Sequence, residues 1–403
     1  MQEKALTLSP MRIAILQQSY GRFGGAERLA LSHYIEMRRR GLDVTFYYTG
    51  TMSRGWEDRL DGESLRSIPT AILNRPKRFR LLKKFLEELK QYDKIIIHHH
   101  IEPVLAFYLS KVLGPRIVWY SGSMFELAWE EIITGIDYRR ISPTVRRTGG
   151  EFYGGLLARM LLSDQLYGLT ARVAKAVDIA TVRGYGKIVA NSFFLSKFLE
   201  RVYHLGETPS VVYPAADPLL EQLASKNHAR EEDYMLIVGS LIPLKNVQSM
   251  IRAAAHVRSS KVMVIGDGQE MSNLKDLGSE LDVPIEFRGT MNREEDLAQA
   301  YGGCKILVHL SLYEPFGLTP VEAGLFSKPS IVTNHGGPPE VVVDGVTGYI
   351  VDPLDHRFIG SKMNTLLDND TLRHNMGRRA RENIVEKFTL ERSTTRLVEE
   401  VET

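Results

Sequence analysis

The feature that most constrains this chain is a regular alternation of short apolar runs with helical patterns. Each run is rich in β-branched or aromatic residues and too short to be a helix, and each is followed by a stretch with helical periodicity. Apolar strands separated by helices are typical of a parallel sheet that is covered on both faces. The candidate strands are Arg12–Leu16, Val44–Tyr48, Ile95–His98, Ile117–Tyr120, Lys187–Ala190, Val211–Tyr213, Met235–Val238, Val262–Ile265, Ile285–Phe287, Ile306–His309, Ser330–Thr333 and Gly348–Val351. We therefore expect an α/β fold.

The alternation divides into two similar halves. The segment between them, Pro214–Asp233, is polar and shows no strand pattern, and only helical patterns remain after about Ser361. A chain of 403 residues also exceeds the size at which single cores stop growing, about 250–300 residues. We expect a doubly wound domain over residues 1–213, a linker over 214–233, a second such domain over 234–380, and a helix over 381–403 that packs back toward the first domain. A ligand should bind between the domains, at the carboxyl ends of both sheets.

Composition excludes several classes of protein. The chain has 51 Lys and Arg against 49 Asp and Glu, a net charge of +2, so we expect no general affinity for nucleic acid. Its single cysteine, Cys304, excludes an intramolecular disulfide framework and a cysteine-based zinc site. No apolar run approaches the ~18 residues of a membrane-spanning helix, and the first residues lack the pattern of a secretion signal. We expect a cytoplasmic protein, either free or peripheral on the cytoplasmic membrane face.

A glycine-containing loop follows the first strand. Paired glycines, Gly24 and Gly25, precede the first helical pattern. Backbone N–H groups at such a helix start can approach an anion, which the helix dipole also attracts. The spacing is not that of the dinucleotide fingerprint. The loop is therefore either a ligand contact or only a tight turn.

A second loop, Val238–Asn246, also connects a strand to a helix. Lys245 would lie beside the helix start, a place that suits a phosphate or diphosphate. The alternative is an exposed lysine in a capping turn.

The third loop carries two carboxylates eight residues apart. Glu314 lies in a loop after a strand, and Glu322 lies within the next helix, so both can point into one crevice. The backbone amides of Gly317–Thr319 lie between them in sequence and could hold an anion. Many surface helices contain such a glutamate pair by chance, but the surrounding Glu-Pro-Phe-Gly and Glu-Ala residues make the motif specific.

With these motifs the chain resembles glycosyltransferase family 4, retaining enzymes of GT-B fold that use nucleotide-sugar donors. The resemblance extends over most of the chain, and within the family it is greatest to the mannosyltransferases that extend lipid-linked oligosaccharides. It rests on Gly24–Arg28, Val189–Ser192, Val212–Pro214, Gly239 with Lys245-Asn246, Val264–Gly268, Glu314–Glu322, Gly336–Glu340 and Asp344–Gly348.

The resemblance implies a role for each motif. Glu322 would hold the ribose hydroxyls, Glu314 would contact the transferred sugar, and Lys245 would neutralise the diphosphate leaving group. Glu314 and Lys245 would be the catalytic residues, and neither a metal nor a cofactor would be needed. The implied donor site comprises Gly24, Gly25, Gly239, Ser240, Lys245, Gly266, Gly268, Arg288, Thr290, Met291, Glu314, Phe316, Gly317, Leu318, Thr319 and Glu322.

Two departures from the family pattern stand in the sequence. Ser240 occupies a place where the family has an arginine, so Arg22 or Arg288 would have to supply that diphosphate contact. The stretch Trp119–Ser123 lacks the histidine that many members place near the sugar, and Ser121 and Gly122 stand there instead. The polar contact is made differently, or the chain is less active than its relatives.

Three histidines follow the third strand candidate. In a strand, His98 and His100 would share one face and His99 the other. They could bind a metal, line the acceptor cleft, or form a packed strand end; we expect His98 and His100 to line the cleft. The sequence Asp368-Asn369-Asp370 resembles a metal motif, but we expect a helix cap there.

A basic amphipathic stretch occurs in the first half. Phe79, Leu81, Leu82 and Phe85 alternate with Arg75, Lys77, Arg78, Arg80, Lys83 and Lys84, with no acidic residue among them. Such a stretch can lie on an anionic membrane, or it can be a solvated helix face. Arg139, Arg140, Arg146 and Arg147 form a second basic cluster.

The sequence thus predicts a metal-independent retaining hexosyltransferase, most simply one that moves mannose from GDP-mannose to a lipid-linked or other glycan acceptor. One alternative is a transferase that uses a UDP-sugar to make a polysaccharide or glycolipid. Another is a non-catalytic partner subunit of GT-B fold, which Ser240 and the missing histidine would favour.

Overall fold

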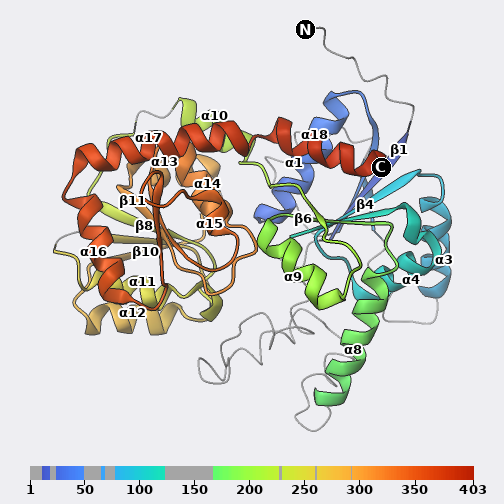
Figure 1. The fold of residues 1–403 in the computed structure, drawn as a ribbon, viewed down its shortest axis with the longest axis horizontal. Coiled ribbons are helices and arrows are strands. Elements are labelled where there is room, and N and C mark those ends of the chain that lie inside the picture. Colours follow the sequence, from blue (N-terminus) through green and yellow to red (C-terminus); the bar gives the residue numbers. More distant parts are fainter. Residues whose placement is uncertain are drawn as a thin grey trace.

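The molecule consists of two lobes, each built on its own parallel sheet (Figure 1). The computed structural model describes residues 11–18, 24–49, 65–68, 78–122, 167–226, 229–258, 261–291 and 293–403. Every strand pair in both sheets is parallel. This confirms the expected two doubly wound α/β domains.

Among the described residues, the first sheet has seven strands in the order β3-β2-β1-β4-β5-β6-β7. They are β1 (Arg12–Gln18), β2 (Asp43–Thr49), β3 (Leu65–Ser67), β4 (Lys94–His98), β5 (Ile117–Ser121), β6 (Lys187–Ala190) and β7 (Ser210–Val211). Successive residues of β4 alternate between two cores, since Ile95 and Ile97 belong to one and Ile96 to the other. The helices that cover these faces include α1 (Gly25–Arg39), α3 (Arg78–Leu89), α4 (Pro103–Leu113), α8 (Tyr167–Val182) and α9 (Phe193–Tyr203).

The second sheet has six strands in the described part, in the order β10-β9-β8-β11-β12-β13. They are β8 (Tyr234–Val238), β9 (Lys261–Ile265), β10 (Ile285–Gly289), β11 (Ile306–His309), β12 (Ser330–Thr333) and β13 (Gly348–Val351). Its helices include α11 (Val247–Ala254), α12 (Met271–Glu280), α13 (Glu294–Gly303), α14 (Leu318–Leu325), α15 (Pro338–Val341) and α16 (His356–Leu367). Strand order reverses at β1 in one sheet and at β8 in the other, and ligands of such folds bind at these points.

The segment expected to be a linker contains a helix. This helix, α10 (Pro218–Ser225), begins with a capping bond from the Leu219 N–H to the Asp217 carboxylate at 2.8 Å. Leu220 is fully buried in a core cluster of the second domain. One apolar side chain per turn is enough for a short helix such as α10 to dock. The absence of a strand pattern in this segment therefore did not exclude a helix.

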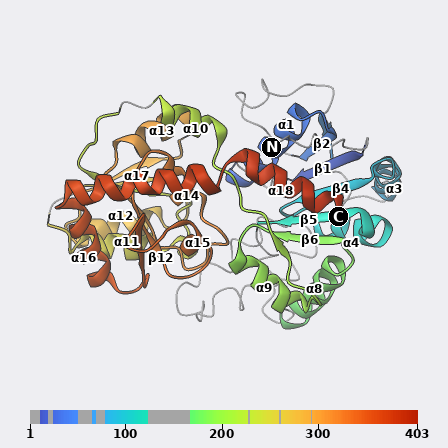
Figure 2. The same ribbon diagram turned by 45° about the horizontal axis from the view of Figure 1, so that its top comes forward.

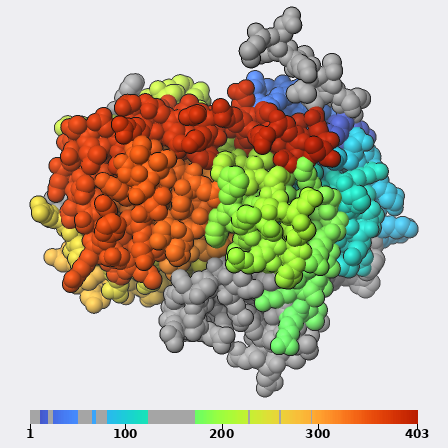
Figure 3. Space-filling view, viewed as in Figure 1, coloured from blue at the N-terminus to red at the C-terminus, as the bar shows by residue number. Residues whose placement is uncertain are grey.

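The C-terminal helices connect the two lobes. Helix α17 (Asp370–Lys387) packs on α14, and α18 (Leu390–Glu402) packs on α1. Leu397 and Val401 lie in the same core cluster as Ile13 and Ile15 of β1. Figures 2 and 3 show the two helices as one band that crosses both lobes. The helical segments divide at Phe388–Thr389, later than the expected boundary at residue 381.

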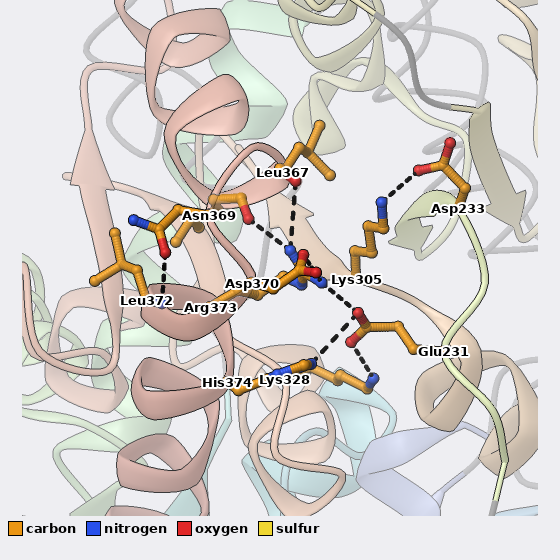
Figure 4. Close-up of polar contacts among 11 residues, drawn as sticks. Glu231, Asp233, Lys305, Lys328, Leu367, Asn369, Asp370, Leu372, Arg373 and His374 are labelled. Atoms are coloured by element: carbon orange, nitrogen blue, oxygen red, sulfur yellow. Dashed lines mark hydrogen bonds and ion pairs between the residues drawn. The ribbon is translucent and has the colours of Figure 1, made fainter.

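A buried ionic cluster ties the end of the linker to the second domain (Figure 4). The Glu231 carboxylate accepts from Arg373 at 2.5 Å and from Lys328 at 3.1 Å, and Arg373 is only 2% exposed. Asp370 pairs with the same guanidinium at 2.7 Å. Asn369 caps α17 by accepting from the Leu372 N–H at 2.9 Å, as expected of this turn. Glu231 is therefore held to the second domain.

Candidate active site

A lysine–glutamate pair stands at the carboxyl edge of the second sheet. Lys245 Nζ donates to Glu314 Oε2 at 2.5 Å, and His309 Nε2 lies 3.3 Å from the same oxygen. Burial alone would raise the pKa of Glu314, but Lys245 and His309 together lower it to about 2. Glu314 is therefore ionised at neutral pH and faces a fixed cation. The structure brings together the two residues expected to be catalytic.

Glycines shape the loop that carries Glu314. Gly317 has a φ of 101° at the start of α14, and Gly336 has a φ of 82°. A Cβ on Gly336 would lie 2.3 Å from the Glu314 carbonyl oxygen, so a larger residue cannot fit there. The Gly337 N–H donates to that carbonyl at 2.8 Å. Gly336 and Gly337 therefore pack against the backbone of the Glu314 loop. Gly317–Thr319 form the N-terminal turn of α14 at the end of that loop.

His309 is a site residue that the sequence analysis missed. It ends β11, is 4% exposed, and its Nδ1 lies 3.0 Å from the Thr319 hydroxyl. Its Nε2 is shared between Glu314 and Ser311. A histidine at the end of an otherwise apolar strand was the available signal. His309 joins the Glu314 carboxylate to the first turn of α14.

Glu322 lies in a separate buried network. It is 6% exposed and accepts from the Tyr301 hydroxyl at 2.6 Å. Burial raises its pKa, and the nearby Arg28 and the Tyr301 bond oppose that rise. Arg28 comes from α1 of the first domain and pairs with Asp217 at 3.4 Å. Arg28, Asp217 and Glu322 line one pocket, which places Glu322 between the domains. The other residues that line it are Gly25, Leu29, Ser32, Ala215, Ala216 and Leu318.

The glycine loop of the first domain meets the Glu314 loop of the second. A Cβ on Gly25 would lie 2.8 Å from Leu318 Cδ1, so the two segments are in contact. The Gly24 N–H is occupied by the Glu27 carboxylate at 3.0 Å, which caps the start of α1. Gly25 and Leu318, both predicted donor-site residues, thus lie side by side. Gly21–Phe23, including Arg22, lie outside the described residues.

Glu340 links the two domains beside this contact. Its carboxylate accepts from the N–H groups of Phe193 and Phe194, each at 2.8 Å, and from the Tyr213 hydroxyl at 3.0 Å. Ser192, the N-cap of α9, donates its hydroxyl to the Pro315 carbonyl at 2.5 Å. A carboxylate at a helix N-terminus is favoured by the helix dipole. The second domain therefore caps a helix of the first, a function that the sequence motif did not reveal.

The remaining predicted donor residues surround the carboxyl ends of β8, β9 and β10. Gly239 and Gly266 pack backbone to backbone, since a Cβ on Gly266 would lie 1.8 Å from the Gly239 oxygen. A Cβ on Gly268 would lie 2.4 Å from the Leu241 oxygen. Ser240 and Thr290 are exposed and Met291 is half-buried. Arg288 pairs with Glu286 on its own strand, so it is not held toward Lys245 as a substitute for the missing arginine.

Phe316 does not face open space. It is 2% exposed and packs against Tyr213 and Phe388, with ring centroids 5.7 and 5.6 Å away. These aromatic rings come from the Glu314 loop, the end of the first domain and the junction of α17 with α18. Three segments converge on its side chain, which makes a packing contact, and the donor contact of this residue stays a prediction.

The predicted acceptor-side residues lie at the carboxyl ends of β4 and β5. His98 and Ser121 are fully buried, and Gly122 is buried as well. They end β4 and β5, central strands that helices cover on both faces. His100 is half-buried beside Trp119, with ring centroids 5.7 Å apart. His99 leaves the strand with a φ of 63°, so the alternation expected of a strand ends at His98.

The basic stretch is described only in part. Arg80, Lys83 and Lys84 are exposed on α3, whereas Leu82 and Phe85 are buried against the first sheet. Arg75, Lys77, the side chain of Arg78 and the second basic cluster lie outside the described residues. Within the described residues, none of the helices is both long and apolar enough to span a bilayer.

Comparison with known proteins agrees with this geometry. Residues 220–383 match the sequence model of the family glycosyl transferases group 1. The chain is 30% identical to N-acetyl-alpha-D-glucosaminyl L-malate synthase of Bacillus anthracis over 43% of its own length and 46% of that protein. It is 24% identical to the alpha-1,3/1,6-mannosyltransferase ALG2 of Dictyostelium discoideum over 50% of its length and 57% of that protein. The chain thus spans about half the length of the curated relatives it matches.

Solved structures match nearly the whole chain. Anabaena HepE in complex with UDP superimposes with a TM-score of 0.70 at 18% identity, over 96% of this chain and 99% of that one. Sucrose-phosphate synthase from Thermosynechococcus elongatus superimposes with a TM-score of 0.71 at 18% identity, over 96% and 98%. Residues 220–383 therefore resemble the family glycosyl transferases group 1, and they form most of the second half of a two-domain fold of the GT-B type.

Proposed function

We propose that this chain is a metal-independent, retaining glycosyltransferase that moves a hexose from a nucleotide-sugar donor to a glycan acceptor. The observation that carries the proposal is the Lys245–Glu314 pair beside the N-terminal turn of α14, within a glycosyltransferase domain. Preorganised cations and backbone amides stabilise charge that develops on a leaving group. A diphosphate is such a group.

The chemistry follows from what each residue can do. Lys245 and the amides at the start of α14 would receive the diphosphate as its bond to the sugar breaks. Glu314, ionised at neutral pH, would accept hydrogen bonds from sugar hydroxyls, and Glu322 from the ribose. The leaving phosphate would take the proton of the acceptor hydroxyl on the same face of the sugar. No protein nucleophile is assigned.

The donor is proposed from two different likenesses. The likeness to the mannosyltransferase ALG2 favours mannose, and we propose GDP-mannose as the first donor to test. The HepE structures with UDP and UDP-glucose favour a UDP-sugar as the second candidate. Titration of purified protein with GDP and UDP, followed by turnover of GDP-mannose and UDP-glucose, separates the two. If neither nucleotide binds and neither donor is turned over, the chain is a non-catalytic partner subunit and the proposal fails.

We further propose that the protein is cytoplasmic and binds the anionic face of a membrane through α3, where its lipid-linked acceptor would lie. Arg80, Lys83 and Lys84 share the exposed side of this helix with Leu81, which is 42% exposed. Flotation with vesicles that contain phosphatidylserine should carry the protein upward at low salt. Replacement of the three cations by glutamine should leave it at the bottom; flotation of the wild type that equals this variant contradicts the proposal.

A further inference from the structure

A chain of histidines connects the C-terminal helix to the end of β4. Ser393 of α18 donates its hydroxyl hydrogen to the Tyr213 carbonyl at 2.7 Å, and His33 Nε2 lies 2.9 Å from the same Oγ. His33 Nδ1 lies 3.2 Å from His98 Nε2, and His98 Nδ1 lies 3.0 Å from His99 Nδ1. His33 and His98 are fully buried. The bonds therefore run from α18 through α1 to the carboxyl edge of the first sheet.

The direction of the first bond fixes all the others. Ser393 has one hydrogen, and the Tyr213 carbonyl takes it, so the Ser393 oxygen accepts from His33 Nε2–H. A neutral imidazole has one N–H, which leaves His33 Nδ1 to accept from His98 Nε2–H. By the same rule, His98 Nδ1 accepts from His99 Nδ1–H. His99 Nε2 is then left with a lone pair and no hydrogen.

The surroundings keep these rings neutral. Burial, together with the positive charge of Arg40, lowers the pKa of His33 to about 3. Burial also lowers the pKa of His98 well below its ordinary value, with help from His99 and His33. Burial and the neighbouring His100 and His33 lower the pKa of His99 to about 3. An extra proton would place two N–H groups on one ring and break the acceptor pattern.

His99 is held in a conformation that residues with a side chain rarely adopt. Its φ is 63°, and its backbone is fixed by a bond from its N–H to the Tyr120 carbonyl and by one from the Trp119 indole at 2.5 Å. A Cβ on Gly122 would lie 2.4 Å from His99 Nε2, so this ring position needs glycine there. Strained residues of this kind persist where the surroundings determine them, and they cluster at functional sites.

The sheet order places His99 beside the second domain. Strands β4 and β5 lie between β1 and β6. The loop after β1 touches the Glu314 loop through Gly25 and Leu318, and the loop after β6 touches it through Ser192 and Pro315. The end of β4 is therefore framed by two segments that both contact the catalytic loop. Within the described part of the chain, His99 Nε2 has no hydrogen-bond partner.

We propose that His99 Nε2 accepts a hydrogen bond from a non-reacting hydroxyl of a sugar bound in the cleft, and that Ser393, His33 and His98 are positioning residues that fix its tautomer. The ligand class rests on the proposed glycosyltransferase function, whereas the tautomer chain stands on the geometry alone. A hydroxyl that donates to His99 is held in one orientation. The C-terminal helix thus takes part in substrate selection from the far side of the first domain.

Nitrogen NMR of protein labelled with ¹⁵N-histidine tests the chain directly. In the wild type, His99 should show a protonated Nδ1 and an unprotonated Nε2, and His99→Asn, a residue that tolerates positive φ, identifies its signals. Ser393→Ala should give a mixture of His99 tautomers. Thr394→Val is the matched control, because Thr394 is also buried on α18 and its hydroxyl has no hydrogen-bond partner among the described residues. A protonated Nε2 in the wild type, or an unchanged spectrum in Ser393→Ala, overturns the proposal.

A sugar titration tests the ligand. Methyl α-D-mannopyranoside should shift the His99 Nε2 signal, and Ser393→Ala should raise its Kd about three- to tenfold, the worth of one hydrogen bond. Thr394→Val should leave the Kd unchanged. If the wild type turns over a donor but Ser393→Ala keeps the wild-type Kd, this inference fails and the function stands. If the tautomer and the shift are as described but no donor is turned over, the proposed function fails instead.

Discussion

At the scale of single residues, the two domains use charge in opposite ways. The second domain stabilises an ion, because Lys245 and His309 hold the pKa of Glu314 down to about 2 despite its burial. The first domain excludes ions, because burial of His33 and His98 holds their rings neutral. Under the proposed function, a site for a diphosphate would therefore face an edge for uncharged hydroxyl groups.

The buried His33 should make the fold sensitive to mild acid. Its pKa is about 3 in the folded chain and about 6.5 when unfolded. Below pH 6.5 the unfolded chain binds a proton that folded His33 does not, so the free energy of unfolding falls as pH decreases from 6.5 toward 3. Between pH 6.5 and 5 the loss is about 2 kcal/mol. Glu314 contributes only below its unfolded value of about 4.5. The pKa values of His98 and His99 are lowered as well, so these rings add to the same slope. Urea denaturation at pH 7, 6 and 5 measures the slope, and His33→Gln should reduce it without abolishing it; equal slopes in the two proteins contradict the account.

At the scale of elements, the sequence predicted most strands because central strands are apolar throughout. It missed β3, since Leu65-Arg66-Ser67 is a short polar edge strand, and it missed α10, which docks through Leu220. The sequence motifs located the Lys245–Glu314 loops, since glycines and carboxylates occur there at fixed spacing. The sequence could not locate the Ser393–His33–His98–His99 chain, because it joins residues of α18, α1 and the end of β4 that only the tertiary fold brings together.

The cap that Glu340 provides for α9 should control domain closure. Glu340→Ala leaves the N–H groups of Phe193 and Phe194 without their acceptor, which typically costs about 1–2 kcal/mol. The domains should open, and the radius of gyration from small-angle X-ray scattering should rise. Asp355→Ala is the matched control, because Asp355 caps α16 within one domain by accepting from the Phe358 N–H at 3.0 Å. Asp355→Ala should lower the free energy of unfolding without a change in the radius of gyration. The same radius of gyration in both variants and the wild type would show that Glu340 does not control domain closure.

At the scale of the whole molecule, the C-terminal helices make the two domains interdependent. The chain leaves the second domain along α17 and completes the core of the first with α18 (Figure 1). The amphipathic pattern of residues 390–402 was visible in the sequence. Its docking site on α1 was not, because a pattern shows which face of a helix is apolar but not which surface that face covers.

Leu397 should therefore stabilise a domain that lies almost 200 residues before it. Its side chain is fully buried with Ile13 and Ile15, and Leu397→Ala should cost about 2–5 kcal/mol. Hydrogen exchange should accelerate in β1, β2 and α1 and stay unchanged in β8–β13. Arg396→Ala, at an exposed neighbouring position, should change neither. Uniform loss of protection in both sheets would show instead that the molecule unfolds as a single unit.

The central claim is that Lys245 and amides, rather than a metal ion, stabilise the departing diphosphate. The most direct measurement is donor turnover by the wild type, Lys245→Ala and the exposed control Lys275→Ala, each with and without EDTA. We predict that EDTA has no effect, that Lys275→Ala matches the wild type, and that Lys245→Ala loses about 10²–10³ in kcat. Turnover that EDTA abolishes, or Lys245→Ala with the kcat of the wild type, would contradict the account.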